Sequence, residues 1–573
     1  MISAEEARGP LHSESGPEPF WSTTNAGEAI PGVITPLCWS LWGHGVELGI
    51  RDCYARLGAL PRREVRLPEC PEDRLISVFY GRAALNVNFL CRMGSRLPGS
   101  SPDAIARQLL GHVPDELPRT RSFARLPVVA AKLPWAQATI RRDVLRRTAP
   151  IHSWWRRSVD AAASLDENGA RALLGAAQER FLEMTRVQAG GLFIAVQAVY
   201  DSFTALVKRA GLPVEQENAL LAGQGSHVET EMIVDLWELS RDRLTLDEFL
   251  RRHGYHGPME GEISSTPWRE DPEPVRRLVA HYAARDDDEN PSRAGVWRTE
   301  ARREAERALL ASLPAWERPR ARFVLAATLS RIPLRGVAKA GFVQSLDVAR
   351  AAARRLGTHL TDRGVLSGPD DVFYFTADEL LVGLGPDASR TAAQRRSQRA
   401  AFARLTLPHH WRGAPLPVTD AGNSSDATGI APGPPASASK AAAHEPTVVR
   451  GIAASGGVVE GRVRVVDDPA FTEVEPGEVL VGVTTDPSWA SVLFLSSALV
   501  VDVGGPLSHA AVVAREFAVP CVVGTGDATT VLRTGDLVRV DGNDGTVELL
   551  RRAAADPPRP ARPDDTTIER TSL

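Results

Sequence analysis

His509 has a side chain and a sequence context that suit the transfer of a phosphoryl group. It follows Ser508 and a pair of glycines, between an apolar segment that predicts a buried strand (498–503) and a segment that predicts a helix (510–516). Glycine lets the backbone approach a ligand closely, and a helix N-terminus attracts anions. Because neutral imidazole is nucleophilic near pH 7, His509 is a candidate phosphoryl acceptor. The alternative is a polar helix cap that happens to contain histidine.

A second cluster of chemically capable residues is His253, His256 and Glu260, in a segment punctuated by glycine and proline. These side chains can deprotonate a hydroxyl or bind a transferred phosphoryl group. They can equally form a hydrogen-bonded structural turn. The His-x-x-His spacing also permits a metal pair, but the loop context and the lack of an obvious third ligand argue against it, so we predict no metal site.

A third set of candidates lies near the N-terminus and combines hydrogen-bonding groups with aromatic rings. Such a mixture suits a small, partly hydrophobic hydroxyl compound. The alternative is that the aromatic residues, which lie near proline and glycine, are core anchors. The candidate substrate-binding residues in this set are Asn25, Glu28, Thr35, Trp39, Arg82 and Asn86.

The pattern of apolar residues along the chain predicts a multidomain protein whose helices and strands position these candidate residues. Apolar residues recur at helical spacing over most of 20–416, clearest at 169–208, 215–243, 274–285, 298–313 and 342–363, which predicts a mainly α-helical N-terminal substrate domain. Alternating and continuous apolar runs in 447–552 predict a compact C-terminal α/β domain.

Three further segments lack the apolar residues needed for a core. Residues 417–446 are rich in Gly, Pro, Ser and Ala and predict a disordered, mobile linker, although a tolerated insertion between docked domains fits equally well. We also expect a flexible N-terminus (1–19) and a disordered tail (553–573).

Composition excludes several classes of protein. The chain of 573 residues carries 67 Lys and Arg against 71 Asp and Glu, a net charge of −4, which gives no electrostatic reason to expect nucleic acid. Its 5 cysteines show no Cys-x-x-Cys spacing. The acidic N-terminus shows no secretory signal, and no uncharged apolar run reaches the roughly 20 residues needed to span a bilayer. We therefore expect a cytoplasmic location and no membrane partner.

From Gly451 to Leu549 the chain resembles the phosphohistidine swivelling domain of the phosphoenolpyruvate-utilising enzymes. The resemblance implies that His509 is the phosphorylated, catalytic histidine and that neighbouring groups hold the phosphoryl oxygens. The matching runs are 451–461, 486–489, 504–516, 520–524, 528–529 and 540–542. The candidate phosphoryl-binding residues are Gly504, Gly505, Ser508, Thr485 and Arg515.

Most of residues 20–415 resemble the antibiotic-binding domain of rifampicin phosphotransferases. The matching runs are 21–40, 79–86, 220–226, 253–260, 265–272 and 371–374. The chain departs from that pattern where His256 replaces an arginine and where Arg335-Gly336 replaces an Arg-Glu pair. Both departures put the handling of substrate in doubt, because a charged group there can orient substrate or act as acid or base.

The family also implies an ATP-grasp domain before the Trp21 motif, where this sequence has only 20 residues. We therefore expect a dikinase-type phosphotransferase component. An ATP-grasp partner acting in trans would bind ATP and Mg²⁺ and load His509, and the acceptor would be a small-molecule hydroxyl or carboxyl. Two alternatives stay open: a non-catalytic binding or sequestering protein, and a phosphocarrier that relays to another protein.

Overall fold

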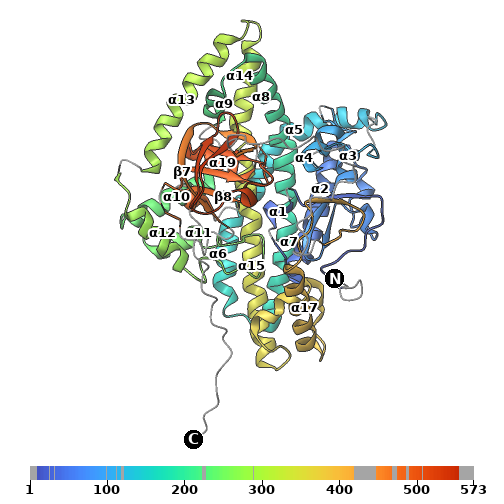
Figure 1. The fold of residues 1–573 in the computed structure, drawn as a ribbon. Helices are drawn as coiled ribbons and strands as arrows, with labels where there is room; N and C mark the ends of the chain where they lie inside the picture. Colours follow the sequence, from blue (N-terminus) through green and yellow to red (C-terminus); the bar gives the residue numbers. More distant parts are fainter. Residues whose placement is uncertain are drawn as a thin grey trace, which may run out of the picture.

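The protein is described by a computed structural model over residues 9–24, 26–30, 32–98, 100–110, 112–117, 122–221, 227–287, 290–417, 447–466, 474–475, 477–485, 489–493, 495–505 and 508–553 (Figure 1). A helical region with a small sheet is followed by an α/β domain, as the sequence predicts. The expected linker, apart from residue 417, lies outside the described residues, and so do residues 554–573 of the expected tail.

A four-stranded antiparallel sheet joins the two ends of the helical region. Its order is β2-β3-β1-β4, and Phe20 pairs with Arg412 across β1 and β4. Residues 9–19, expected to be flexible, instead pack on this sheet: Leu11 is buried and the Ser13 amide donates to the Val78 carbonyl at 2.8 Å. The strands are β1 (Phe20–Ser22), β2 (Ile76–Phe79), β3 (Arg82–Asn86) and β4 (His410–Arg412).

Long helices form the main core of the region, where α7 packs against both α2 and α15. Small residues on α15, such as Gly341 and Ala349, allow this close approach. The helices and single turns are α1 (Ala26–Ala29), α2 (Pro36–Leu57), η1 (Arg62–Glu64), η2 (Pro71–Asp73), α3 (Val87–Gly94), α4 (Pro102–Leu110), α5 (Leu126–Thr148), α6 (Ile151–Ala162), α7 (Glu167–Ala189), η3 (Gly190–Val196), α8 (Gln197–Ala210), α9 (Val214–Leu221), α10 (His227–Ser240), α11 (Leu246–His253), α12 (Glu273–Ala283), α13 (Pro291–Ser312), α14 (Arg318–Arg331), α15 (Leu334–Asp362), η5 (Pro369–Tyr374), α16 (Ala377–Val382) and α17 (Ala388–Ala403).

One helical stretch, Glu167–Ala210, comprises α7, the π-helical turn η3 and α8. By length and composition it is apolar enough to cross a membrane, and 53% of its most apolar window is buried inside the fold. Burial of this kind is what the core helix of a folded domain shows.

The C-terminal domain contains an eight-stranded sheet of order β5-β12-β11-β7-β8-β9-β10-β6. The four strands β7 to β10 are parallel, and every residue of β8, β9 and β10 is buried, as expected for strands covered on both faces. The elements are β5 (Val448–Arg450), β6 (Ile452–Ser455), β7 (Val458–Val465), β8 (Val479–Gly482), α18 (Ala490–Leu493), β9 (Ala498–Val501), α19 (His509–Phe517), β10 (Cys521–Val523), α20 (Ala528–Val531), β11 (Leu537–Asp541) and β12 (Thr546–Arg551).

The two regions share a hydrophobic core, which we call the shared core. Helices α10, α11 and α12 contribute residues such as Leu236 and Phe249, and the α/β domain contributes Trp489, Leu493 and Ala510. Helix α19 and strand β6 contact α9, and α18 contacts α10; Figure 1 shows the α/β domain beside these helices. The α/β domain is therefore docked on the helical region beside the segment that carries His253 and His256.

Candidate functional site

His509 is the first residue of α19, at the end of the parallel sheet where β9 stops. Ser508 caps the helix with extended backbone (φ −63°, ψ 163°), and its Oγ accepts a hydrogen bond from the Ala511 amide at 3.3 Å. The imidazole is 8% exposed, and its Nδ1 is hydrogen-bonded to Thr485 Oγ1 at 3.1 Å. The ring is therefore oriented through Nδ1 at a helix N-terminus, where backbone amides favour an anion.

The candidate phosphoryl-binding residues fall into two groups. Gly504 lies against the Ser508 hydroxyl, the space beside Gly505 is open, and the Gly505 carbonyl accepts from the Ser508 amide at 2.9 Å, so the glycine turn adjoins the cap that precedes His509. Thr485, predicted to hold phosphoryl oxygens, contacts the imidazole of His509. The structure thus brings Thr485, Ser508 and the glycine turn to His509.

Arg515, expected to bind the phosphoryl group, is placed elsewhere. Its Nε donates to the Ala454 carbonyl at 2.8 Å, which ties α19 to β6. The guanidinium is buried, and this desolvation lowers its pKa, while Tyr200 and Glu217 of the helical region act in the opposite direction. Six residues are about one and two-thirds helical turns, so Arg515 lies about 120° around α19 from His509 and about 9 Å further along the helix.

Asp502 is a residue that the sequence reasoning missed. Its carboxylate accepts hydrogen bonds from Thr525 Oγ1 at 2.7 Å, from the Ala528 amide at 2.6 Å and from Thr529. These bonds join the end of β9 to α20 and fix the turn that leads to Gly504. An acidic residue directly after a buried strand and before two glycines was the available signal.

Several N-terminal candidates have structural partners. Thr35 caps α2, and its amide and Oγ1 donate to Glu262 at 2.9 and 2.7 Å. Arg82 donates to the carbonyls of Phe402 and Leu405 at 3.0 and 2.6 Å. These contacts agree with structural roles for Thr35 and Arg82.

Of the remaining N-terminal candidates, the structure describes the side chains of Asn86 and Trp39. Asn86 caps α3 and donates to the Glu72 carbonyl at 2.8 Å, and Trp39 is half-buried against the main core. Asn25 lies outside the described residues, as does the side chain of Glu28.

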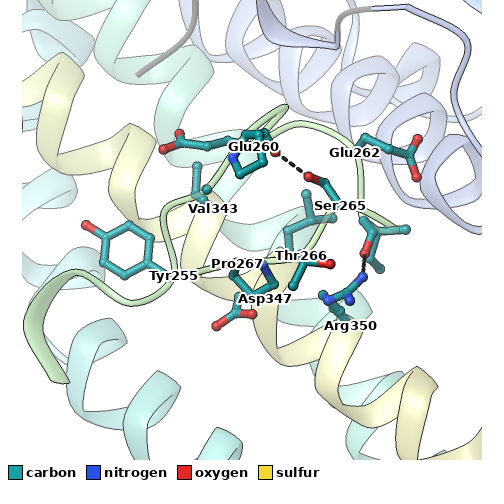
Figure 2. A pocket seen from close by; sticks show the side chains of 13 residues that line it. Tyr255, Glu260, Glu262, Ser265, Thr266, Pro267, Val343, Asp347 and Arg350 are labelled. Carbon is teal, nitrogen blue, oxygen red and sulfur yellow. Dashed lines mark hydrogen bonds between the residues drawn. The ribbon is translucent and has the colours of Figure 1, made fainter. Parts of the chain in front are cut away.

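A small cavity lies between α15 and the segment 254–272, which we call the cavity loop. Its volume is about 30 Å³, enough for one or two water-sized groups. Figure 2 shows its polar side chains on both walls. The cavity is lined from the loop by Tyr255, Glu260, Glu262 and Ser265, and from α15 by Val343, Asp347 and Arg350, among others.

Most charged groups of this cavity are engaged with one another or with the backbone. Asp347 accepts from Trp155 Nε1 at 2.7 Å and from the Arg269 guanidinium at 2.7 Å. Arg350 donates to the Ile263 carbonyl at 2.9 Å and to Glu270 at 2.9 Å. Glu262 is held by Thr35 and by the Ser264 amide. Sequence reasoning missed the α15 residues because the fold brings them to the loop from about eighty positions away.

Glu260 is the exception among the cavity carboxylates. Its Oε1 is hydrogen-bonded to His256 Nδ1 at 2.5 Å, and the side chains of His256 and Glu260 are 4% and 3% exposed. Glu260 Oε2 is buried and has no hydrogen-bond partner among the described residues. The His256 ring packs against Tyr255 and Trp268, with centroids 4.2 and 5.7 Å apart.

His253 points to a different partner. Its Nε2 lies 2.8 Å from Asp235 of α10. Burial lowers the pKa of His253 and the Asp235 carboxylate acts against this shift, so the ring is neutral at pH 7 and donates its Nε2 proton to Asp235. Within the described ranges, no group of three or more His, Cys, Asp or Glu side chains is arranged to hold a metal ion.

Two parts of the chain match models of protein families. Residues 474–545, which include Thr485 and His509, match the mobile domain of phosphoenolpyruvate-utilising enzymes. Residues 243–336, which include the cavity loop, match the fourth domain of rifampicin phosphotransferase. Both resemblances stated from the sequence are thereby confirmed for these residues.

The chain is also similar to individual proteins, over different lengths of its sequence. An uncharacterized protein of Mycobacterium tuberculosis is 28% identical over 606 residues, covering 97% of this chain and 65% of that protein. A rifampicin phosphotransferase of a Streptomyces species is 31% identical over 318 residues, covering 54% of this chain and 34% of the relative. The phosphoenolpyruvate synthase of Aeropyrum pernix is 51% identical over 102 residues, covering 18% of this chain and 12% of that enzyme. The chain thus spans about two thirds or less of the length of each of these relatives.

Proposed function

We propose, from the mobile domain that this chain shares with the phosphoenolpyruvate-utilising enzymes, that it is a phosphotransferase component in which His509 carries the phosphoryl group. The observation that carries the proposal is the setting of His509 at the capped N-terminus of α19. Because Thr485 holds Nδ1, we assign Nε2 as the nitrogen that forms the bond to phosphorus. The amides of the Gly504–Gly505 turn would receive the phosphoryl oxygens.

The donor half-reaction is assigned to a partner protein. We infer that an ATP-grasp protein acting in trans binds ATP and Mg²⁺ and transfers a phosphoryl group to His509. Dividing the reaction in two gives each step a moderate barrier, since the phosphorylated imidazole keeps the phosphoryl group reactive. A cytoplasmic location, where ATP is supplied, goes with this proposal.

The acceptor half-reaction is assigned to the helical region. We infer that a small-molecule hydroxyl or carboxyl group binds there and receives the phosphoryl group. The match of residues 243–336 to the fourth domain of rifampicin phosphotransferase supports this placement, and it makes rifampicin one acceptor to test.

The loading of His509 is tested by intact-mass spectrometry at neutral to alkaline pH. The wild-type protein is incubated with ATP, Mg²⁺ and a candidate ATP-grasp partner, and separately with phosphoramidate, which needs no partner. We expect the mass of one phosphoryl group to be gained, to be lost in acid and to be absent from His509→Ala.

A matched variant tests the role of Thr485. Thr485→Val keeps the shape of the side chain but removes the hydroxyl that contacts Nδ1, so loading should slow without a change in the site of modification. If the wild-type protein gains no phosphoryl group from either donor, the carrier proposal fails and a binding protein remains.

A further inference from the structure

We propose that the cavity beside α15 receives a neutral hydroxyl group, and that Glu260 takes the proton of that hydroxyl as the phosphoryl group is transferred. This inference rests on the proposed function and narrows its acceptor from a hydroxyl or a carboxyl to a hydroxyl alone. It also makes Glu260 a catalytic residue and His256 its positioning residue.

The charge of the cavity favours a neutral hydroxyl over a carboxylate as the acceptor group. Three acidic residues, Glu260, Glu262 and Asp347, are among the lining residues, and the guanidinium of Arg350 is already bound to Glu270 and to the Ile263 carbonyl. A carboxylate acceptor would bring a like charge to this set of groups, which is unfavourable at short range in a site of low dielectric. A hydroxyl instead supplies the hydrogen-bond donor that Glu260 Oε2 lacks among the described residues.

The size of the cavity limits what enters it. A volume of about 30 Å³ admits a hydroxyl group and little more, so the remainder of the acceptor lies outside. The buried carboxylate of Glu260 would therefore contact only the hydroxyl group of the acceptor and not the rest of the molecule. Burial also keeps bulk water from competing for the base.

His256 fixes which oxygen of Glu260 is used. Its Nδ1 is held against Oε1 at 2.5 Å, and Oε2 is the carboxylate oxygen that has no hydrogen-bond partner among the described residues. The His256 ring packs against the rings of Tyr255 and Trp268, and this packing helps to set its orientation. This arrangement follows the general pattern of a base oriented by a third group.

The same packing connects the cavity loop to the carrier. Trp268 and Phe249 belong to the shared core, and so does Ala510, which follows His509 in the chain. The C-terminal α/β domain, which contains the residues that match the mobile domain, is thus docked on the elements that position His256. A phosphoryl donor and an acceptor base are in this way supported by one continuous packed cluster.

The transfer step balances without another reactant. The acceptor oxygen attacks phosphorus, and the new O–P bond forms as the P–Nε2 bond of His509 breaks. The hydroxyl proton passes to Glu260 Oε2. The electron pair of the broken bond returns to Nε2, and with Nδ1 protonated His509 leaves as neutral imidazole.

The experiment separates loading from transfer. The full chain is loaded with phosphoramidate, freed of excess reagent, and the fraction of phosphorylated His509 is measured by intact mass. It is then mixed with phenol or methanol as hydroxyl probes, or with benzoate or formate as carboxylate probes of matched framework. Phosphorus NMR follows the products, and rates are expressed per loaded His509.

We expect transfer to phenol and methanol by the wild-type protein, little transfer to benzoate or formate, and a loss of about 100-fold or more in the rate for Glu260→Gln. The inference is overturned by equal rates in the wild-type protein and Glu260→Gln, by faster transfer to the carboxylates, or by a loaded protein that phosphorylates neither alcohol. Failure of loading itself would instead overturn the proposed function.

His256 is tested by a conservative and a disruptive variant. Gln at this position can still donate to Glu260 Oε1, whereas Leu cannot, so His256→Gln should retain much more of the phenol-transfer rate than His256→Leu. The saturation constant for phenol should change little in either variant, because His256 acts through Glu260. Similar rates in the two variants, both far below that of the wild-type protein, would contradict the positioning role.

Discussion

At the scale of single residues, two histidines three positions apart are held in different ways. His253 ends α11 and donates to Asp235 of α10, whereas His256 lies in the cavity loop and is bound to Glu260. The first contact holds two helices together, and the second leaves Glu260 Oε2 without a hydrogen-bond partner among the described residues. The sequence indicates only a polar cluster, so a structural turn and a chemical site could not be separated from spacing alone.

The neutral state of His253 predicts a pH dependence of stability. Its pKa is lowered by burial, with Asp235 opposing and the nearby Arg252 and His256 adding to the shift, so the unfolded chain binds a proton more readily than the folded protein. The stabilising contribution of neutral His253 is therefore present above pH 6.5 and is lost as the pH falls below this value. In urea unfolding at pH 7.5 and 5.5, the wild-type protein should lose more stability on acidification than His253→Gln. An equal loss in both proteins would contradict this account.

Prediction from sequence at this scale succeeds where the determining contacts are local. The helix expected at 510–516 corresponds to α19 and follows from the residues within and beside it. Arg515 shows the limit: whether it faces the phosphoryl turn or Ala454 depends on what packs over α19. Asp347 and Arg350 could not be assigned to the cavity, because their partners lie on a loop that is distant in sequence.

At the scale of elements, the cavity loop approaches α1 and α2 most closely at Gly261. The Gly261 carbonyl accepts from Trp42 Nε1 at 2.8 Å and from Cys38 Sγ at 3.1 Å, both on α2. A side chain at Gly261 would meet the Ala29 carbonyl oxygen at 2.0 Å. The absence of a Cβ at this position is therefore a condition for the loop to reach α1 and α2.

Gly261→Ala should displace the cavity loop and destabilise the protein by about 2 kcal/mol or more, since a backbone atom cannot move aside as a flexible side chain can. Gly27→Ala is the matched control, because a Cβ there meets nothing within 4 Å. Thermal unfolding of both variants checks the prediction. A Gly261→Ala protein as stable as Gly27→Ala would show that the loop has another way to dock.

The helical elements themselves were predicted well wherever apolar spacing is continuous. The expected helices at 274–285 and 298–313 correspond to α12 and α13. Within the expected helix at 215–243 the structure describes α9 and α10, and residues 222–226 between them lie outside the described part of the chain.

At the scale of the whole molecule, the docking of the mobile domain depends on the shared core. Trp489 is 3% exposed and packs with residues of α10 and α11, while Leu532 belongs to a separate cluster made only of mobile-domain residues. The sequence predicted the two regions and their classes. It could not predict that their apolar surfaces pack against each other. The apolar spacing along a helix or strand is the same whether its apolar face packs within its own domain or against another domain.

Trp489→Ala should weaken docking, whereas Leu532→Ala should weaken only the mobile domain. Removing a buried tryptophan costs about 3–5 kcal/mol, part of which here is contact with the helical region. Hydrogen exchange should therefore quicken in α10 and α11 for Trp489→Ala and stay near the wild-type rate there for Leu532→Ala. Faster exchange of these helices in both variants would indicate that the two regions unfold as one unit.

The pairing of β1 with β4 has a consequence for biosynthesis. Thr23 donates to the His409 carbonyl across a separation of 386 residues, so the first strand of the helical region has no permanent neighbour on that side until the last strand has been made. At roughly 5–20 residues per second, a ribosome needs about 20–80 s to cover that distance. During this interval the nascent chain exposes an unpaired strand edge, the kind of surface that chaperones recognise.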